Sequence, residues 1–295
     1  MRIFLKRHEN WREKVPALFR RAAALTMAVL LLSGLLPAQA AEAETCAVPI
    51  LMYHEIKTFK TGADVITPYE FECDLKYLKE HGFQTVTMSQ LIHFTKGEEA
   101  LPENPVVLTF DDGYLSTYHY AFPLLKKYHM RIVLSVIGKN ADDFTEHPDD
   151  DNLDYAHATW PQLKEMADSG FVELQNHTYD LHSLSRGRIG CTQRKGESDG
   201  EYARLLADDL GKLQGEILQC IGFLPNTFAY PYGKSGAYTE KLVRELGFQA
   251  TLTCDYGVNL LTRDPECLFG LKRIRRGHGD RLEKLLAAAM KTIRH

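Results

Sequence analysis

Short apolar runs alternate with helical patterns through most of the chain. Each run is three to five residues long and rich in residues that favour strands. The predicted strands are residues 50–53, 84–87, 106–110, 132–136, 172–175, 227–230, 250–252 and 271–274. Because a helical pattern or a long loop follows each of them, we expect the strands to form a parallel sheet.

Start and stop signals mark the helices between these strands. Pro68 and Gly82 indicate a helix that begins after Thr67 and ends before the glycine. Ser89 is expected to cap a short helix that stops at Gly97. A capping box of Thr159 and Gln162 marks the start of another helix. Three more helices are predicted at residues 201–220, 237–246 and 281–293.

Seven or eight parallel strands allow a closed barrel or an open doubly wound sheet. No GxGxxG or GxxxxGK[ST] follows any predicted strand, which disfavours the open sheet that binds nucleotides. We therefore predict an α/β fold, a deformed (β/α) barrel with seven or eight parallel strands. Two polar segments, residues 142–154 and 183–200, are expected to be surface loops. A more specific interpretation is that they lie at the rim of the barrel and shape access of the substrate.

The N-terminus has the order of a secretory signal peptide. Seven basic side chains precede an apolar run of 15 residues, 22–36, and Ala38-Gln39-Ala40 follows. An uncleaved anchor is the alternative, although the run is shorter than the roughly 20 residues that span a bilayer. We expect residues 1–40 to be a signal peptide or anchor and residues 41–295 to be one domain, secreted or associated with the cell envelope.

Charge and cysteine content narrow the classes of partner. Residues 41–295 carry 28 basic and 37 acidic side chains, a net charge of −9. An acidic surface argues against nucleic acid and suits a neutral or partly cationic substrate. The six cysteines form no CxxC, which disfavours a thiolate zinc site, and their pairing stays open.

The most informative chemistry follows the strand predicted at 106–110, where Asp111 and Asp112 precede Gly113. In a (β/α) barrel the carboxyl ends of the strands surround the active site. Adjacent side chains there point in different directions, so one carboxylate can bind a metal while the other faces the substrate. A solvated Asp-Asp-Gly turn is the alternative.

Histidines follow two other predicted strands. His177 and His182 are five residues apart, so they do not share a helix face and would have to converge from a loop. Two imidazoles and one carboxylate leave coordination positions open on Zn²⁺ or a similar ion. His54 ends the strand at 50–53, a position that favours function over a core histidine.

In combination, these motifs resemble a known family. TFDDG at 109–113, a later histidine pair and Pro231-Tyr232 after the next strand resemble the polysaccharide deacetylases with a NodB homology domain, of the carbohydrate esterase family 4 type. The resemblance extends from Val48 to about Ile274. Met52-Tyr53-His54 is further similar to the circularly permuted subgroup that includes bacterial poly-N-acetylglucosamine deacetylases, whose acid histidine lies near the N-terminus.

The resemblance implies a role for each motif residue. Asp112, His177 and His182 would bind one divalent metal, with Zn²⁺ expected and Co²⁺, Ni²⁺ or Fe²⁺ as alternatives. Asp111 would be the general base and His54 the general acid that protonates the leaving amine. The backbone N–H of Tyr232 would help to hold the oxyanion.

The sequence departs from the family pattern at several positions. The family spaces its two histidines by four residues, and this chain by five. The family has an arginine where Ala229 stands. Arg273 is the candidate substitute, and the alternative is that Arg273 is an ordinary surface arginine. The aspartate-and-tryptophan fourth motif has no clear counterpart. His278, in an Arg-Gly-His-Gly turn, is the competing candidate for the acid.

The resemblance implies an exported, metal-dependent hydrolase that removes N-acetyl groups from a polysaccharide containing N-acetylglucosamine. A catalytically silent carbohydrate-binding barrel is the alternative, supported only by the missing motif arginine. Another metal hydrolase, such as a phosphodiesterase, is disfavoured because such sites usually hold two metals. Peptidoglycan, poly-N-acetylglucosamine and chitin oligomers all remain open as the polymer.

Overall fold

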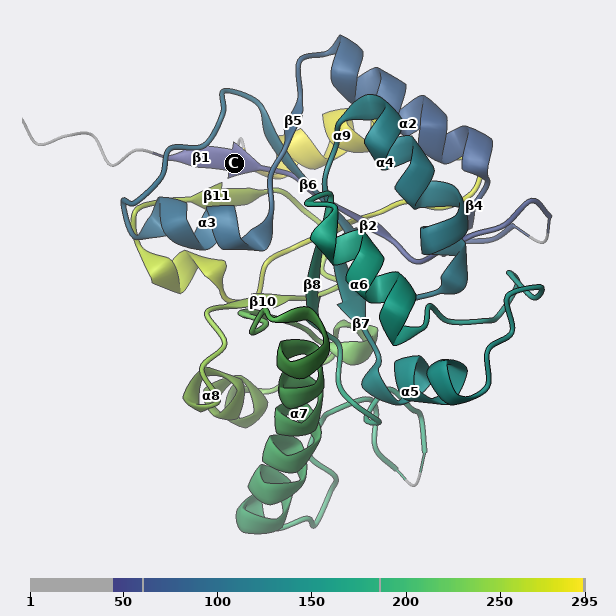
Figure 1. The fold of residues 1–295 in the computed structure, drawn as a ribbon. Coiled ribbons are helices and arrows are strands. Elements are labelled where there is room, and N and C mark those ends of the chain that lie inside the picture. The colour runs from purple at the N-terminus through teal and green to yellow at the C-terminus, as the bar shows by residue number, and fades with distance from the viewer. Residues whose placement is uncertain (1–44, 60, 186, 294–295) are drawn as a thin grey trace, which may run out of the picture. The chain divides into compact units, whose positions relative to one another are not determined.

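Parallel strands curl into a deformed barrel with helices around it in this computed structural model, which describes residues 45–59, 61–185 and 187–293 (Figure 1). The main sheet has the order β10-β9-β8-β7-β6-β2-β12, with β5 beside β6. These strands are β2 (Ile50–Tyr53), β5 (Gln84–Thr85), β6 (Pro105–Phe110), β7 (Ile132–Val136), β8 (Val172–Asn176), β9 (Thr227–Ala229), β10 (Ala250–Leu252) and β12 (Ile274–Arg275). The predicted fold class is confirmed, while the predicted signal segment 1–40 lies outside the described residues.

The strands follow one another around the barrel in chain order. Each neighbouring pair is parallel, and β12 returns to β2. Between β10 and β12 the barrel closes through Leu271, whose N–H donates to Thr251 O at 2.9 Å and whose carbonyl accepts from Thr253 N at 2.9 Å.

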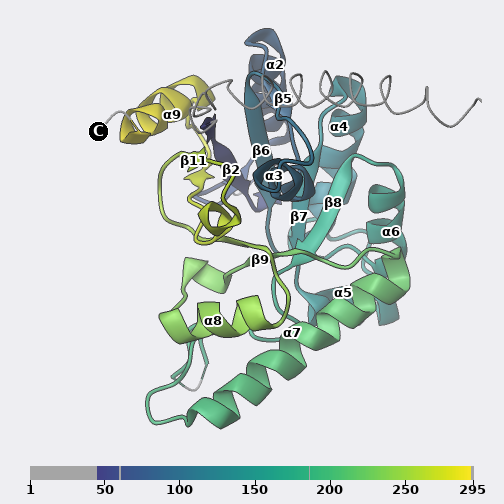
Figure 2. The same ribbon diagram turned by 90° about the vertical axis from the view of Figure 1, so that its left-hand side faces the viewer.

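Helices connect the strands and cover the barrel. They are α2 (Pro68–Glu80), α3 (Met88–Thr95), α4 (Phe122–Tyr128), α5 (Gly138–Glu146), α6 (Trp160–Asp168), α7 (Asp199–Ile221), α8 (Ala237–Glu245) and α9 (Leu282–Ala289). Both views show α2, α4 and α9 grouped together, with α7 and α8 at the opposite end (Figures 1 and 2). In the part of the chain that the structure describes, no helix is both long and apolar enough to cross a bilayer.

The predicted cap of α3 is wrong by two residues. Thr87, not Ser89, accepts the N–H of Gln90, and the Gln90 side chain accepts the N–H of Thr87. The N–H of Ser89 donates instead to the carboxylate of Glu173, 3.2 Å away in β8. This tertiary contact has no signal in the local sequence, whereas the predicted capping box of Thr159 and Gln162 is confirmed at α6.

The acidic segment predicted to be a loop is partly helical, because α5 extends to Glu146. Asp142 accepts hydrogen bonds from the Trp160 indole at 2.8 Å and from the Tyr179 hydroxyl at 2.9 Å. Lys139 pairs with Asp143 one turn along the helix. These partners stabilise a helix whose composition alone indicated a solvated loop. The second loop prediction is corrected at its end, since α7 already begins at Asp199.

Short pairings outside the main sheet were also not predicted. β1 (Cys46–Val48) pairs antiparallel with β11 (Asn259–Leu261), and β3 (Glu55–Ile56) pairs with β4 (Val65–Ile66). The first of these places the start of the domain against its C-terminal part.

Side chains alternate between the two faces of β2 and β6, and this alternation sets the direction in which His54 and Asp111 point. Leu51 and Tyr53 belong to the same core cluster as Leu108 and Phe110, whereas Ile50 and Val107 belong to the cluster on the other face. Tyr53 pairs with Phe110, so the residues that follow these two strands lie next to each other. With a period of two, His54 and Asp111 continue the face of Ile50 and Val107.

Candidate active site

Three potential metal ligands converge at the carboxyl ends of β6 and β8. Asp112 Oδ1 lies 3.5 Å from His177 Nε2 and 3.4 Å from His182 Nε2. The three donor atoms all lie within 4.8 Å of one another. Two ligands at tetrahedral positions, each about 2.0–2.2 Å from Zn²⁺, are about 3.3–3.5 Å apart, so the carboxylate–imidazole distances fit a shared ion.

The surroundings of these donors also fit a metal centre. Asp112 Oδ1 is buried and has no hydrogen-bond partner among the described residues. His177 is buried, and its Nδ1 lies 2.7 Å from the carbonyl oxygen of Ala229, which sets this nitrogen as the donor and leaves the lone pair of Nε2 for a metal. Burial lowers the pKa of His182 to about 4, and a proton on the adjacent His177 would lower it further, so the His182 ring is neutral near pH 7.

The backbone at Asp112 explains why two adjacent aspartates face different partners. Asp112 has a φ of 71°, in the left-handed region that aspartate enters more readily than most residues. The chain turns sharply there, which carries the Asp112 side chain to the histidines. Asp111, still aligned with the strand, faces the barrel interior.

Asp111 forms a buried, two-point ion pair with Arg273. The guanidinium donates to both carboxylate oxygens, at 2.8 and 2.7 Å, and its Nε donates to Thr253 O at 2.7 Å. Both side chains are almost fully buried. Burial raises the pKa of Asp111, but the charges of Arg273 and His177 outweigh it and hold the pKa well below its usual range.

His54 lies on the other side of Asp111. Its Nε2 is 3.9 Å from Asp111 Oδ2, and its Nδ1 is 3.9 Å from Asp64 Oδ1. Asp64 in turn accepts two hydrogen bonds from Arg275. Asp64 could not be predicted from the sequence, because an isolated aspartate in a loop carries no local signal.

His278, the competing candidate for the acid, has different neighbours. Its Nδ1 lies 3.0 Å from Glu70 Oε2, and its backbone N–H donates to Gly62 O. The side chain is 49% exposed and does not line the cleft that contains Asp111. The geometry thus places His54, and not His278, beside the candidate base.

Tyr232 borders the site from the turn after β9. It has a φ of 57°, and its ring centroid lies 4.6 Å from that of His182. Gly233 makes this turn possible, because a Cβ there would lie 2.5 Å from the backbone nitrogen of Cys254. The predicted residues other than Arg273 therefore line one cleft of about 260 Å³, which Cys254 and Tyr114 also line, while Arg273 lies buried against Asp111.

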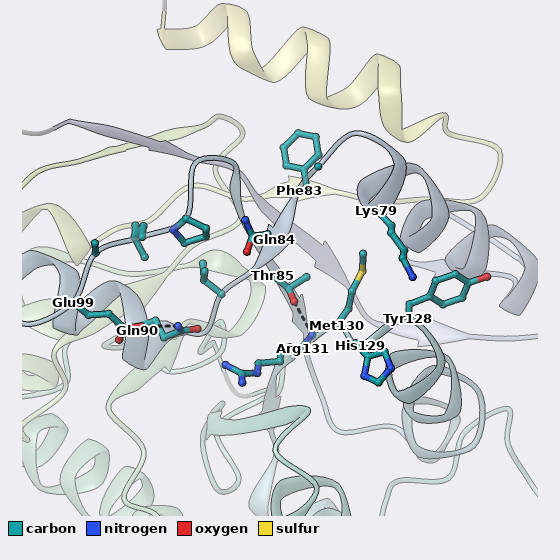
Figure 3. A pocket seen from close by; sticks show the side chains of 15 residues that line it. Lys79, Phe83, Gln84, Thr85, Gln90, Glu99, Tyr128, His129, Met130 and Arg131 are labelled. Atoms are coloured by element: carbon teal, nitrogen blue, oxygen red, sulfur yellow. Dashed lines mark hydrogen bonds between the residues drawn. The ribbon is translucent and has the colours of Figure 1, made fainter.

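A larger hollow, of about 750 Å³, is lined by β5 and its flanking residues and by residues that precede β6 and β7 (Figure 3). Gln84 and Thr85 form β5, and Met130 and Arg131 come just before β7. The hollow is therefore at the amino ends of β6 and β7. Barrel chemistry gathers at the carboxyl ends, so we do not assign the hollow to the candidate site.

The chain is similar in sequence to a known protein family and to individual relatives. Residues 98–251 match the profile of a family described as polysaccharide deacetylase. Over 229 residues the chain is 31% identical to YxkH of Bacillus subtilis, named as a polysaccharide deacetylase, a match that covers 77% of this chain and 71% of YxkH.

A second relative and a solved structure extend the comparison. The chain is 29% identical over 199 residues to a poly-beta-1,6-N-acetyl-D-glucosamine N-deacetylase of Escherichia coli, covering 62% of this chain but only 30% of that enzyme. A de-N-acetylase from Aggregatibacter actinomycetemcomitans superposes with a TM-score of 0.70 over 82% of this chain and 99% of the other, at 23% identity. At an identity this low, the superposition shows a shared fold and nothing more.

Proposed function

Since the chain belongs to the polysaccharide deacetylase family, we propose that it is an exported, metal-dependent hydrolase that removes N-acetyl groups from a polysaccharide containing N-acetylglucosamine. One observation carries the proposal: the Asp112, His177 and His182 cluster shares one cleft with Asp111, which Arg273 holds from behind. A bound divalent cation, with Zn²⁺ expected, would polarise the amide carbonyl and lower the pKa of a water molecule.

The remaining groups supply proton transfer and charge stabilisation. Asp111 is kept ionised by Arg273 and accepts the proton of the attacking water as general base. His54 donates a proton to the leaving amine, which is otherwise a poor leaving group. The backbone N–H of Tyr232 stabilises negative charge on the carbonyl oxygen.

A silent carbohydrate-binding barrel is the weaker alternative. Its support in the sequence was the absence of the motif arginine at Ala229. Arg273 provides a guanidinium against both oxygens of Asp111 from a different part of the chain, so that support is lost.

The substrate and location are proposed from the relatives and the charge. The E. coli relative is named for poly-beta-1,6-N-acetyl-D-glucosamine, which makes that polymer the first to test. The net charge of −9 for residues 41–295 suits a polymer that gains free amines as the reaction proceeds, and disfavours nucleic acid. Residues 1–40 would direct the protein out of the cytoplasm as a signal peptide or anchor.

Acetate release tests the activity directly. Purified residues 41–295, loaded with Zn²⁺ or Co²⁺, should release acetate from at least one of poly-N-acetylglucosamine, chitin oligomers and peptidoglycan. The protein stripped of metal by a chelator is the control and should regain activity when the ion is restored. A protein that holds one metal ion per chain and releases no acetate from any of these polymers would favour the silent barrel.

Loss of the Arg273 guanidinium should slow the reaction and shift its pH dependence. Arg273 favours the ionised form of Asp111, so Arg273→Ala should raise the pKa of that carboxyl. A general base must be ionised, and the acidic limb of the kcat/KM profile should therefore move to higher pH, with a loss of about 10–100-fold near neutrality.

Arg273→Lys, which keeps the charge, should move the acidic limb less than Arg273→Ala. Removing one partner of a buried pair typically destabilises a fold by about 3–5 kcal/mol, so thermal unfolding of each variant must be measured alongside. A slower variant with an unshifted pH profile would show that Arg273 serves the fold and not the base.

A further inference from the structure

The segment that joins the two histidine ligands follows a path that it could not hold alone. Thr178, directly after His177, has a φ of 77°, which is a strained conformation for a β-branched residue. No helix or strand covers residues 177–182. The position of His182 relative to His177 must therefore be set by contacts with other parts of the fold.

Asp209 of α7 makes two such contacts. Its Oδ1 accepts the backbone N–H of Tyr179 at 2.8 Å, and its Oδ2 accepts that of Asp180 at 2.8 Å. The two amides lie midway between the histidines. One carboxylate thus holds the N–H groups of two successive peptide units against a 23-residue helix, and bonds of this charged kind are stronger than neutral ones.

Other contacts also reach the segment: Lys139 N–H donates to Tyr179 O at 2.9 Å and the Tyr179 hydroxyl donates to Asp142, while Asp209 accepts the N–H groups of Tyr179 and Asp180. The Asn176 side chain accepts the N–H of Thr178, and Gly138 N–H donates to Thr178 O. The Tyr179 ring lies against Gly138, where a Cβ would be 2.6 Å from the ring. Beyond Asp180, the ring of His182 lies beside the rings of His177 and Tyr232, with centroids 4.8 and 4.6 Å away.

We propose that Asp209 is a positioning residue of the metal centre, whose carboxylate fixes the backbone between His177 and His182 so that both Nε2 atoms face Asp112. The proposal rests on the proposed metal site. It also explains how a histidine pair spaced by five residues converges on one ion. A residue with this role acts from the second layer around the metal, where loss of a partner typically lowers metal affinity by about 10–100-fold.

Asp209→Asn is the test variant and Asp208→Asn its matched control. The amide has one oxygen, so it can accept only one of the two N–H groups and turns a donor toward the other. Asp208 is the adjacent residue on α7, is exposed, and loses the same charge in its variant. Affinity for Zn²⁺ and Co²⁺ should be measured on metal-free protein by competition with a chromogenic chelator.

Asp209→Asn should bind both ions about 10–100-fold more weakly than wild type, and Asp208→Asn should match wild type. Unchanged affinity in Asp209→Asn overturns the proposal and leaves the metal site intact. If wild type and His177→Ala both fail to bind metal, the proposed metal site itself fails, which is a different result.

Hydrogen exchange gives a second measurement that needs no variant. In metal-free wild type, the amides of Tyr179 and Asp180 should already be protected, because Asp209 holds them before the metal binds. Rapid exchange of both amides without metal would overturn the proposal even if Asp209→Asn does not fold.

Discussion

Asp111→Asn should lose most of its turnover, by about 10²–10⁴-fold in kcat, while it retains the metal. Asparagine keeps the shape of the side chain but cannot accept a proton at neutral pH. In the structure Asp111 is bound to Arg273 at both oxygens, and it is Asp112 that faces the two histidines. We therefore expect Asp111 to be needed for proton transfer and Asp112 to be needed for metal binding.

The neighbouring variant Asp112→Asn is the matched control, with the same change of chemistry one residue away. It should lose metal as well as activity, because it removes the anionic ligand of the cluster. Metal content by elemental analysis and kcat on the most reactive polymer should be measured for both variants, together with thermal unfolding, since Asp111→Asn leaves Arg273 without its anion. If Asp111→Asn loses the metal and Asp112→Asn keeps it, the two roles must be exchanged.

Most strands could be predicted because each is a short apolar run between turn signals, but the last was misplaced: it was predicted at 271–274, whereas β12 is Ile274–Arg275 and Leu271 forms only an isolated bridge. Residues 132–136 and 250–252 have the predicted bounds, and the chain order of the strands follows from the alternation with helices. The helix α4 was missed because it has no side-chain cap hydrogen bond and follows directly on a π-helical turn, Thr117–Ala121. The β1–β11 pair depends on partners more than 200 residues apart, which no local pattern contains.

Some residues of the candidate site could likewise be predicted from the sequence and others could not. Asp111, Asp112 and His54 end strands, so a barrel brings them to one edge whatever its details. The contact of Arg273 with Asp111 joins residues 162 positions apart and depends on how the barrel closes, so the sequence could only propose it. Asp209 had no signal at all, because its partners are backbone amides and any loop supplies those.

His54→Ala should lower kcat by about 10²–10⁴-fold, leave the metal and fold intact, and remove the alkaline limb of the pH–rate profile. A general acid works only while protonated, so the rate of the wild type should fall at high pH as the acid deprotonates. Without that group the residual rate no longer depends on this titration. The metal should remain, since His54 is not among the three clustered ligands.

His278→Ala is the decisive companion, because it tests the only other histidine that the sequence offered for this role. The structure gives it a hydrogen-bond partner in Glu70 at the start of α2, with half of its side chain in solvent. Its loss should cost at most about 1 kcal/mol of stability, as for other exposed pairs, and leave kcat and its pH dependence unchanged.

The rigid placement of His54 is the physical reason to expect that His54, and not His278, acts as the general acid. A proton donor must come within hydrogen-bond distance of the leaving nitrogen, and His54 directly follows a buried strand, with its Nε2 3.9 Å from the candidate base. His278 sits between two glycines, and one of them, Gly279, has a φ of 79°. If His278→Ala loses the alkaline limb while His54→Ala stays active, the assignment of the acid to the N-terminal histidine is wrong, and the similarity to the permuted subgroup does not extend to its mechanism.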